Sequence, residues 1–159
     1  MMMAVAEPSP IPTGEVYRRH ADELVRYATA LVGPFEAPDV VVDAVVTAFR
    51  SPAWPKVENQ RAYLYRAVLN RSLSVRRSDA RRAAREERFA GGDSVVSSES
   101  SVDAQRALAG LSPQQRAVVY LTYWEDLTPA QISALLDVSE GTVRKQLARA
   151  REQLRRTLQ

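Results

Sequence analysis

The segment LTPAQISALLDVSEGTVRKQL constrains the fold most, because it contains two helix starts separated by a tight turn. Thr128 followed by Pro129 is typical of the first residues of a helix, and Ser139 can cap a second helix. The two predicted helices are separated by Asp137 and Val138. Apolar residues would pack these helices across each other, namely Ile132, Leu135, Val138, Val143 and Leu147. This spacing predicts a helix-turn-helix.

The second of these helices has an apolar side and a basic side. At 100° per residue, one face must be buried and consists of Val143, Leu147, Ala150, Leu154 and Leu158. Residues 141–159 carry six basic residues against one acidic residue. A solvated helix whose cations suit the negative end of its dipole would show the same pattern. We favour DNA recognition, because the cap, the turn and the start of this helix coincide.

In a helix-turn-helix the early turns of the second helix reach base edges in the major groove. Later turns are better placed for phosphates, and arginine can pair bidentately with guanine. The predicted DNA contacts on this helix are Thr142, Arg144, Lys145, Ala148, Arg149, Arg151 and Arg155.

Helical periodicity upstream predicts an all-α chain. The first helix ends at Gly33–Pro34 and has an apolar side formed by Tyr17, Leu24, Ala28 and Leu31. The next segment, PDVVVDAVVTAFR, contains five valines and therefore also fits a strand. Pro38 at a first helical position, with apolar residues at i, i+3, i+4 and i+7, favours a helix. That stripe consists of Val42, Val45, Val46 and Phe49. A third helix is predicted from about Arg61, after a loop with two prolines.

The segment AGGDSVVSSESSV is rich in Gly and Ser and lacks periodicity, which predicts a flexible linker. The chain is therefore expected to form two small helical domains on a tether, the C-terminal one a helix-turn-helix. The expected bounds are a disordered tail over 1–14, a first domain over 15–88, a linker over 89–102 and a second domain over 103–159.

Composition excludes several classes of site. The 159 residues include no cysteine and one histidine, so disulfides, iron–sulfur clusters and Cys/His zinc sites lack ligands. We expect no catalytic residue, no metal and no cofactor. No apolar run approaches the roughly 18 residues of a membrane span, and the chain start lacks a secretory signal pattern. We therefore expect no membrane contact and a cytoplasmic location. His20 is expected to be structural, and Tyr120 and Trp124 are expected to belong to the core instead of forming a base-stacking pair.

The third helix places an aromatic ring, an amide, a hydroxyl and two guanidinium groups on one stripe. At i, i+3, i+7, i+11 and i+14 these residues are Tyr63, Arg66, Asn70, Ser74 and Arg77. Such groups suit a stacked or flipped base of single-stranded DNA. On the pattern alone, an amphipathic helix with a polar outside is the more frequent explanation.

Taken together, these segments resemble the extracytoplasmic-function (ECF) sigma factors of bacterial RNA polymerase. The run from LSPQQRAVV through TVRKQLARARE is similar to that family's promoter-binding fourth domain. APDVVVDAVVTAF and RAYLYRAVLNRSLSVRR resemble helices of its other domain. The resemblance covers about residues 15–88 and 103–158, in the family's order.

The resemblance implies core RNA polymerase and promoter DNA as partners. The C-terminal domain would read the −35 element and touch the β flap, and the stripe on the third helix would read −10. Asn70 would help to hold an extruded base, in a pocket shaped by the loop at about Ala53–Gln60. An anti-sigma factor is a further implied partner.

The resemblance also assigns Asp39, Val42 and Asp43 to the face that docks on the β′ clamp helices. The family usually carries Gln and then Glu or Asp where this chain has Val42–Asp43, so the docking face departs from the pattern. Acids near a helix start are also favoured by the helix dipole alone.

The sequence therefore predicts a sigma factor. The main alternative is a stand-alone helix-turn-helix regulator, which would bind duplex DNA tightly without polymerase, usually as a dimer. A small helical enzyme is disfavoured, because the sequence offers no nucleophile, metal set or phosphate loop.

Overall fold

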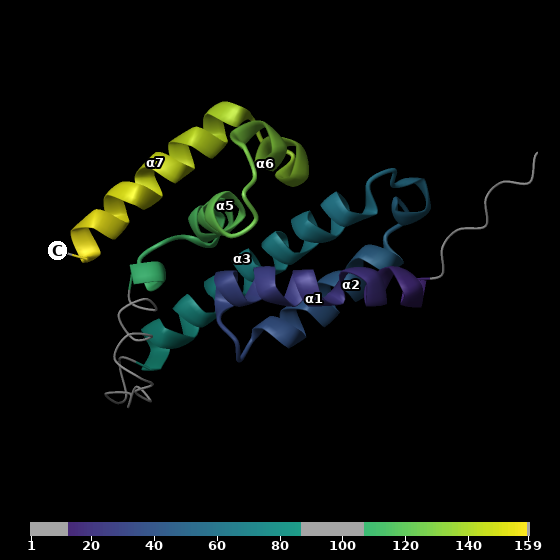
Figure 1. Ribbon diagram of the computed structural model, residues 1–159. Coiled ribbons are helices and arrows are strands. Elements are labelled where there is room, and N and C mark those ends of the chain that lie inside the picture. Colours follow the sequence, from purple (N-terminus) through teal and green to yellow (C-terminus); the bar gives the residue numbers. More distant parts are fainter. Residues whose placement is uncertain (1–12, 87–106, 159) are drawn as a thin grey trace, which may run out of the picture.

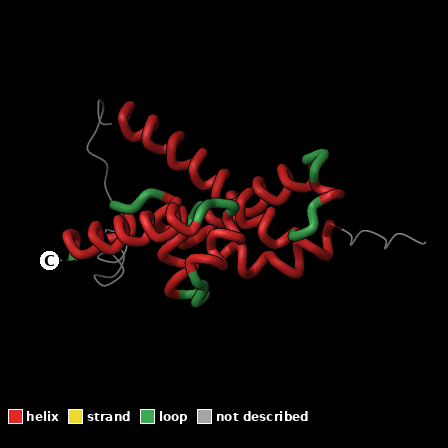
Figure 2. Tube along the Cα trace, turned by 90° about the horizontal axis from the view of Figure 1, so that it is seen from above, coloured by secondary structure: helices red, strands yellow, loops and turns green. Residues whose placement is uncertain are grey.

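The computed structural model describes residues 13–86 and 107–158, which form helices and loops only (Figures 1 and 2). In chain order the elements are α1 (Thr13–Val32), α2 (Ala37–Arg50), the 3-10 helix η1 (Trp54–Lys56), α3 (Gln60–Glu86), α5 (Pro113–Tyr123), α6 (Pro129–Leu136) and α7 (Glu140–Thr157). The predicted all-α fold is confirmed. Helix α1 begins inside the predicted tail over 1–14, and the predicted linker over 89–102 lies outside the described residues.

The helices form two groups that pack on each other. Helices α1, α2 and α3, here called the N-terminal half, contact one another and form the lower layer in Figure 1. Helices α5, α6 and α7, the C-terminal half, lie above them. Helix α5 contacts α7 on one side and both α1 and α3 on the other, and α6 also contacts α3. The two halves therefore share a broad interface.

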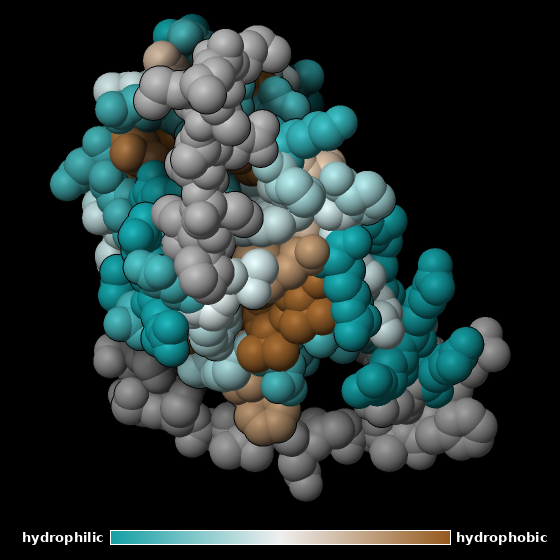
Figure 3. Space-filling view, turned by 90° about the vertical axis from the view of Figure 1, so that its right-hand side faces the viewer, coloured by the Kyte–Doolittle hydropathy of each residue, from teal (hydrophilic) through white to brown (hydrophobic). Residues whose placement is uncertain are grey.

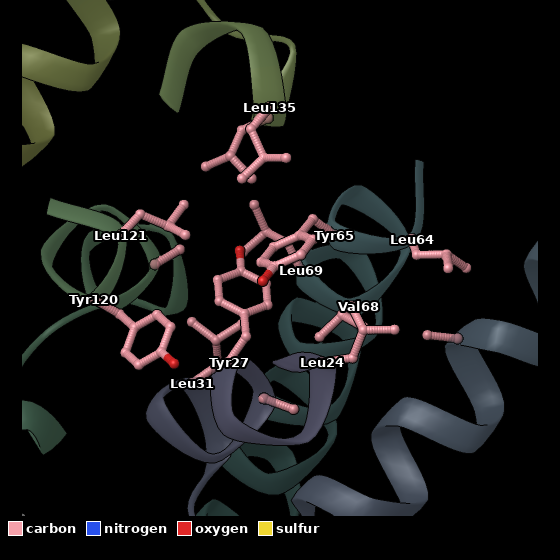
Figure 4. Packing of buried hydrophobic residues seen from close by; sticks show 14 of the residues in the cluster. Leu24, Tyr27, Leu31, Leu64, Tyr65, Val68, Leu69, Tyr120, Leu121 and Leu135 are labelled. Carbon is pink, nitrogen blue, oxygen red and sulfur yellow. The ribbon is translucent and has the colours of Figure 1, made fainter. Parts of the chain in front are cut away.

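One hydrophobic core extends through both halves (Figure 4). The ring of Tyr27 on α1 lies 4.6 Å from that of Tyr65 on α3 and 5.9 Å from that of Tyr120 on α5, centroid to centroid. Leu135 of α6 points toward Tyr65 in Figure 4 and is buried. Burial of apolar area is the main contribution to folding stability. This cluster therefore stabilises each half and also holds the two halves together.

The valine stripe of α2 coincides only in part with the buried side of the helix. Val42 and Val46 are 48% and 40% exposed. The side that packs on α1 and α3 consists of Ala37, Val40, Val41, Ala44, Val45 and Ala48. Alanines on that side allow the helix backbones to approach closely. The predicted helix is confirmed; of its stripe, Val45 and Phe49 pack into the core, whereas Val42 and Val46 do not.

Helices α1 and α3 are joined by Glu23, which is only partly exposed. Its carboxylate accepts hydrogen bonds from Arg61 Nε at 3.1 Å and Tyr65 Oη at 3.1 Å, and contacts His20 Nδ1 at 2.7 Å. Burial opposes ionisation of Glu23, but the contacts with His20, Arg61 and Tyr65 outweigh it and keep the pKa of Glu23 below its ordinary value. His20 thus has the structural role that was expected.

Several large apolar side chains remain at the surface. The exposed ones are Phe35, Val42, Val46, Tyr123, Trp124 and Leu158. Trp124 was predicted to be in the core with Tyr120, but it is 70% exposed because α5 ends at Tyr123 and Trp124 is its C-cap. Leu158, predicted to be buried, follows the end of α7.

Figure 3 shows one face of the molecule, where a hydrophobic patch (brown) is bordered by hydrophilic residues (teal). A patch of this kind marks a candidate contact surface.

Candidate nucleic-acid interface

Helices α6 and α7 form the predicted helix-turn-helix. The Thr128 hydroxyl accepts from Gln131 N–H at 3.2 Å and caps α6, and the Ser139 hydroxyl accepts from Thr142 N–H at 3.0 Å and caps α7. Between them, Asp137 takes the left-handed conformation with φ 56°, which a short polar side chain tolerates better than a branched one. The turn is therefore fixed by local hydrogen bonds.

The inner side of α7 is the predicted one. Val143, Leu147 and Ala150 are buried, and they pack against α5 and α6. Consequently the opposite side of the helix faces outward. Arg144, Lys145, Ala148 and Arg149 are all exposed on that side. The packing of α7 thus presents four of the predicted DNA contacts together on one surface.

The basic side chains of α7 differ in what they contact. Arg144 pairs with Glu140 at 3.3 Å on an exposed surface, and Arg151 donates from Nε to the Tyr123 hydroxyl at 2.8 Å while lying over its ring. Within residues 13–86 and 107–158, Lys145, Arg149 and Arg155 have no ion-pair partner. Thr142 is half-buried in the cap, 2.8 Å from the Ser139 hydroxyl. Lys145 and Arg149 are accordingly the early cations that need no rearrangement to reach a phosphate or a base.

On α3, four of the five predicted −10 residues meet at one hollow of about 550 Å³ between α2 and α3. They are Tyr63, Arg66, Asn70 and Ser74, and the wall opposite is formed by Ala44, Thr47, Ala48 and Ser51. Asn70 and Ser74 are exposed and have side chains available to a ligand. Arg77 lies further along the helix, outside the hollow, with its Nε 3.4 Å from the Leu73 carbonyl oxygen. The fold therefore brings all of the predicted stripe except Arg77 to this hollow.

Two residues of the stripe, Tyr63 and Arg66, already contact other parts of the protein. The Tyr63 ring meets the buried Trp54 edge-on at 5.7 Å between centroids, and Trp54 belongs to the loop predicted to shape the pocket. Arg66 donates from Nε to the Leu135 carbonyl oxygen at 3.1 Å and from Nη2 to that of Ala134 at 3.0 Å, both at the end of α6. Its guanidinium group is therefore bound to the C-terminal half.

The predicted core-docking residues share the outer side of α2. Asp39, Val42 and Asp43 are all exposed, and Val46 continues the same side one turn later. Asp43 forms an ion pair with Arg71 of α3 at 3.1 Å. Because both groups are about half exposed, this pair contributes little to stability and can exchange for another partner.

The described residues contain no group of three or more His, Asp and Glu side chains that could hold a metal ion. In the same part of the chain, no helix is long and apolar enough to cross a membrane.

Comparison with known proteins agrees with this geometry. Residues 101–154 match the family model described as sigma-70, region 4. The chain is 33% identical over 154 residues to the ECF RNA polymerase sigma factor SigL of Mycobacterium tuberculosis, covering 91% of this chain and 87% of SigL. It is 32% identical to the RNA polymerase sigma-E factor of Streptomyces avermitilis, with coverage of 91% and 84%.

The chain belongs to the ECF sigma factor family. Its function is therefore transcription initiation with RNA polymerase at promoter DNA, and a stand-alone regulator is not favoured. Sigma factors are known as non-enzymatic transcription factors.

Solved structures also share the fold of both halves. One is the sigma factor RpoE in complex with the anti-sigma factor NepR from Bartonella quintana, with a TM-score of 0.66, 21% identity and coverage of 91% of this chain and 95% of that one. Another is CnrH in complex with the cytosolic domain of CnrY, with a TM-score of 0.61, 26% identity and coverage of 92% and 86%.

The contacts between the halves of this sigma factor were not predicted from the sequence. Arg116 of α5 is 8% exposed, and it donates to the Leu31 carbonyl oxygen at 2.8 Å and to the Leu108 carbonyl oxygen at 2.7 Å. Burial, and then the proximity of Arg76, lowers the pKa of Arg116 to about 10. The sequence signal for this contact is Arg116 directly before the apolar residues of LSPQQRAVVYL. A cation at such a position indicates a buried hydrogen-bond partner but does not identify it.

Proposed function

We propose that this sigma factor reads the −35 element with α7 and the −10 element with the hollow between α2 and α3. The outer side of α2 would dock on the β′ clamp helices of core polymerase, and the C-terminal half would touch the β flap. In domain terms, residues 15–88 act as a region 2-like domain and residues 103–159 as a region 4-like domain. The observation that carries the proposal is the convergence of four predicted −10 residues on one hollow.

At −35, the exposed side of α7 supports entry into the major groove, because its buried side fixes the orientation of the helix. Lys145 and Arg149 contact bases or nearby phosphates in the early turns, together with Arg144, Ala148 and Thr142. Arg151 and Arg155 lie later in the helix and contact phosphate, which positions the protein without reading sequence.

At −10, the hollow offers an aromatic wall from Tyr63 and an amide from Asn70 to a base that has left the stack. The amide can donate and accept hydrogen bonds on the edge of the base. Ser74 and Arg77 extend the surface along the strand, and Arg66 joins it when released from α6. Opening of the duplex needs no chemical catalysis, since binding of extruded bases stabilises the melted strand. We infer that the protein acts by binding alone and works in the cytoplasm.

An anti-sigma factor is also proposed as a partner. Support comes from the RpoE structure, which was solved with an anti-sigma factor bound. The exposed apolar residues of α2 and of the α5 end give such a partner a surface to cover.

The division between −35 and −10 is tested with libraries that randomise one promoter element at a time, transcribed by holoenzyme. Alanine at Lys145 and Arg149 should change preference in the −35 library and leave the −10 library as in the parent. Alanine at Asn70 should do the reverse. If the α7 variants alter −10 preference, or both sets act equally on both libraries, the proposed assignment is wrong.

A further inference from the structure

A pocket of about 420 Å³ lies where the end of α1 meets α5. Apolar side chains form most of its wall, among them Val32 of α1 and Val119 of α5. Small organic ligands bind in pockets of this size and character. None of the residues proposed to contact promoter DNA or the β′ clamp helices belongs to the wall. Promoter reading and docking therefore leave this pocket without a role.

Two aromatic rings form part of the wall. Tyr120 and Trp124 are stacked, with 12° between their planes and 6.1 Å between their centroids. Tyr120 is buried, whereas Trp124 is exposed, because it follows the last residue of α5. A flat ring in the pocket would cover part of the Trp124 side chain, and contacts between aromatic rings are favourable. The wall is thus suited to an aromatic ligand.

The pocket also contains a buried cation, Arg116, which is charged at neutral pH because burial and Arg76 lower its pKa only to about 10. Its Nε and Nη1 donate to the carbonyl oxygens of Leu108 and Leu31, and its Nη2 has no hydrogen-bond partner among the described residues. In that part of the chain no carboxylate forms an ion pair with it. A buried charge is costly unless it is paired, and an anionic group in the pocket would supply a partner.

A second guanidinium group lies at the same pocket. Arg26 of α1 is exposed, lines the wall and forms no ion pair within residues 13–86 and 107–158. Glu125 accepts a hydrogen bond from the Tyr120 hydroxyl at 3.2 Å, but neither it nor any other acidic side chain is part of the described wall. Two cations beside an apolar wall are complementary to a ligand with one anionic end and one apolar end.

We propose that this pocket binds a small aromatic carboxylate. The ring packs against the apolar wall and Trp124, and the carboxylate accepts hydrogen bonds from Nη2 of Arg116 and from Arg26. An inorganic anion lacks the apolar group that matches the wall, and a neutral ring leaves Arg116 without a counter-ion. The site is separate from the proposed −35 and −10 surfaces and does not depend on their assignment.

Phenylacetate, which is one ring with one carboxylate, is the probe, and the two tryptophan indole N–H resonances of the free full-length protein are the readout. We expect a saturable shift of the Trp124 resonance with a Kd of about 1 mM or tighter. The indole N–H of Trp54, which packs against Tyr63 and is not part of the wall, should not move and is the internal control. At equal ionic strength, phenylacetamide and acetate should each bind at least about tenfold more weakly, because one lacks the charge and the other the ring.

Substitutions separate the two parts of the site. Arg26→Gln and Arg116→Gln should each weaken phenylacetate binding by about tenfold and leave phenylacetamide unchanged. Arg18→Gln is the matched control, since Arg18 is exposed on the same helix and outside the wall. If Arg116→Gln fails to fold, Arg26→Glu, which reverses an exposed charge, replaces it. Trp124→Ala, followed at the amide of Gly33 in the wall, should weaken both ring-containing probes by about fivefold.

The proposal is wrong if phenylacetate gives no saturable shift up to about ten times the expected Kd. Equal binding of phenylacetamide and phenylacetate, or unchanged phenylacetate binding in both arginine variants, would also overturn it. A Trp124 shift that grows with protein concentration in the absence of the probe would show that a second copy covers the pocket, and would contradict a small-molecule site. No promoter DNA or polymerase is present in this measurement, so its failure would leave the −35 and −10 assignments standing.

Discussion

Helices α7 and α3 both carry a stripe of polar and basic residues that we propose to contact DNA, but the two stripes differ in what they already contact within the protein. On α7, Lys145 and Arg149 are exposed and have no ion-pair partner among the described residues. On α3, Arg66 is bound to α6 and Tyr63 rests on Trp54. The side chains on the outside of the helix-turn-helix are therefore accessible as folded. A surface in a hollow between helices depends on its neighbours.

The largest expected effect comes from removing the packing that orients α7. Leu147→Ala should lower the free energy of unfolding by about 3 kcal/mol, because Leu147 is buried against the other C-terminal helices. Urea denaturation measures this change. Leu158→Ala on the same helix is the matched control and should cost less than about 0.5 kcal/mol, since Leu158 is 67% exposed. Equal losses would show that α7 is not held by its inner side.

The second prediction concerns the cations that α7 presents. Lys145→Ala or Arg149→Ala should weaken holoenzyme binding by about 1–3 kcal/mol and relax preference at one −35 position. Arg155→Ala should weaken all −35 sequences about equally and reduce the salt dependence, because it is expected to contact phosphate. Binding to a −35 library at two salt concentrations separates these outcomes. Uniform losses in all three variants would mean that α7 is an electrostatic anchor only.

The third prediction asks how firmly α3 is held in place. Glu23→Gln should lower the free energy of unfolding by about 1.5 kcal/mol at neutral pH, through loss of charged hydrogen bonds to Arg61 and Tyr65. The lowered pKa of Glu23 means that its contribution is present above the ordinary value of 4.5 and is lost as pH falls through the lower folded-state value. The gap between parent and variant should therefore narrow below pH 4.5.

Glu15→Gln is the control for that measurement. Glu15 is about half exposed and pairs with Arg19 at 3.8 Å, so its removal should change stability by less than about 0.5 kcal/mol. A gap between the parent and Glu23→Gln that stays constant from pH 7 to pH 3 would contradict the role given to the Glu23 carboxylate.

The fourth prediction separates capture of the promoter from its opening. Asn70→Ala should cost about 1 kcal/mol in open-complex formation and little in the closed complex, because the amide meets a base only after extrusion. Permanganate reactivity of unpaired thymines is the measurement, on duplex and pre-melted promoters. Ser78→Ala, exposed further along α3, is the control. If closed complexes are lost equally, Asn70 acts through the fold.

The smallest expected effects are on the α2 surface. Asp43→Arg should weaken competition for core enzyme by about fivefold, since it reverses a charge on the proposed docking side. Val42→Gln should preserve or strengthen it, by restoring the polar residue usual in the family. Arg71→Ala is the control, because it removes the ion pair with Asp43 and leaves the acid in place. If Asp43→Arg competes as well as the parent, docking occurs elsewhere.

Much of this molecule could be predicted from its sequence, because local signals determine it. Thr128 and Ser139 form the expected caps, and the spacing of Val143 and Leu147 gave the inner side of α7 correctly. The valine stripe located the inner side of α2 only in part, because Val42 and Val46 lie on the exposed side of the helix together with Asp39 and Asp43.

The contacts between the halves could not be predicted from the sequence either. They pair residues far apart in the chain, such as Arg66 with Leu135 and Arg116 with Leu31, and no periodicity records such a pairing. The stripe on α3 follows helical spacing and could therefore be predicted. The binding of Arg66 to α6 joins distant residues and could not. The roles of the stripe and of the α2 surface stay predictions.

The most direct test of the account is transcription reconstituted from core RNA polymerase, this protein and a library of promoters that varies −35 and −10 independently. We predict that core enzyme with the protein initiates selectively, with preferences at both elements, while the protein alone binds the same duplexes weakly. Tight sequence-specific binding by the protein alone, with no effect on initiation by core enzyme, would contradict the account.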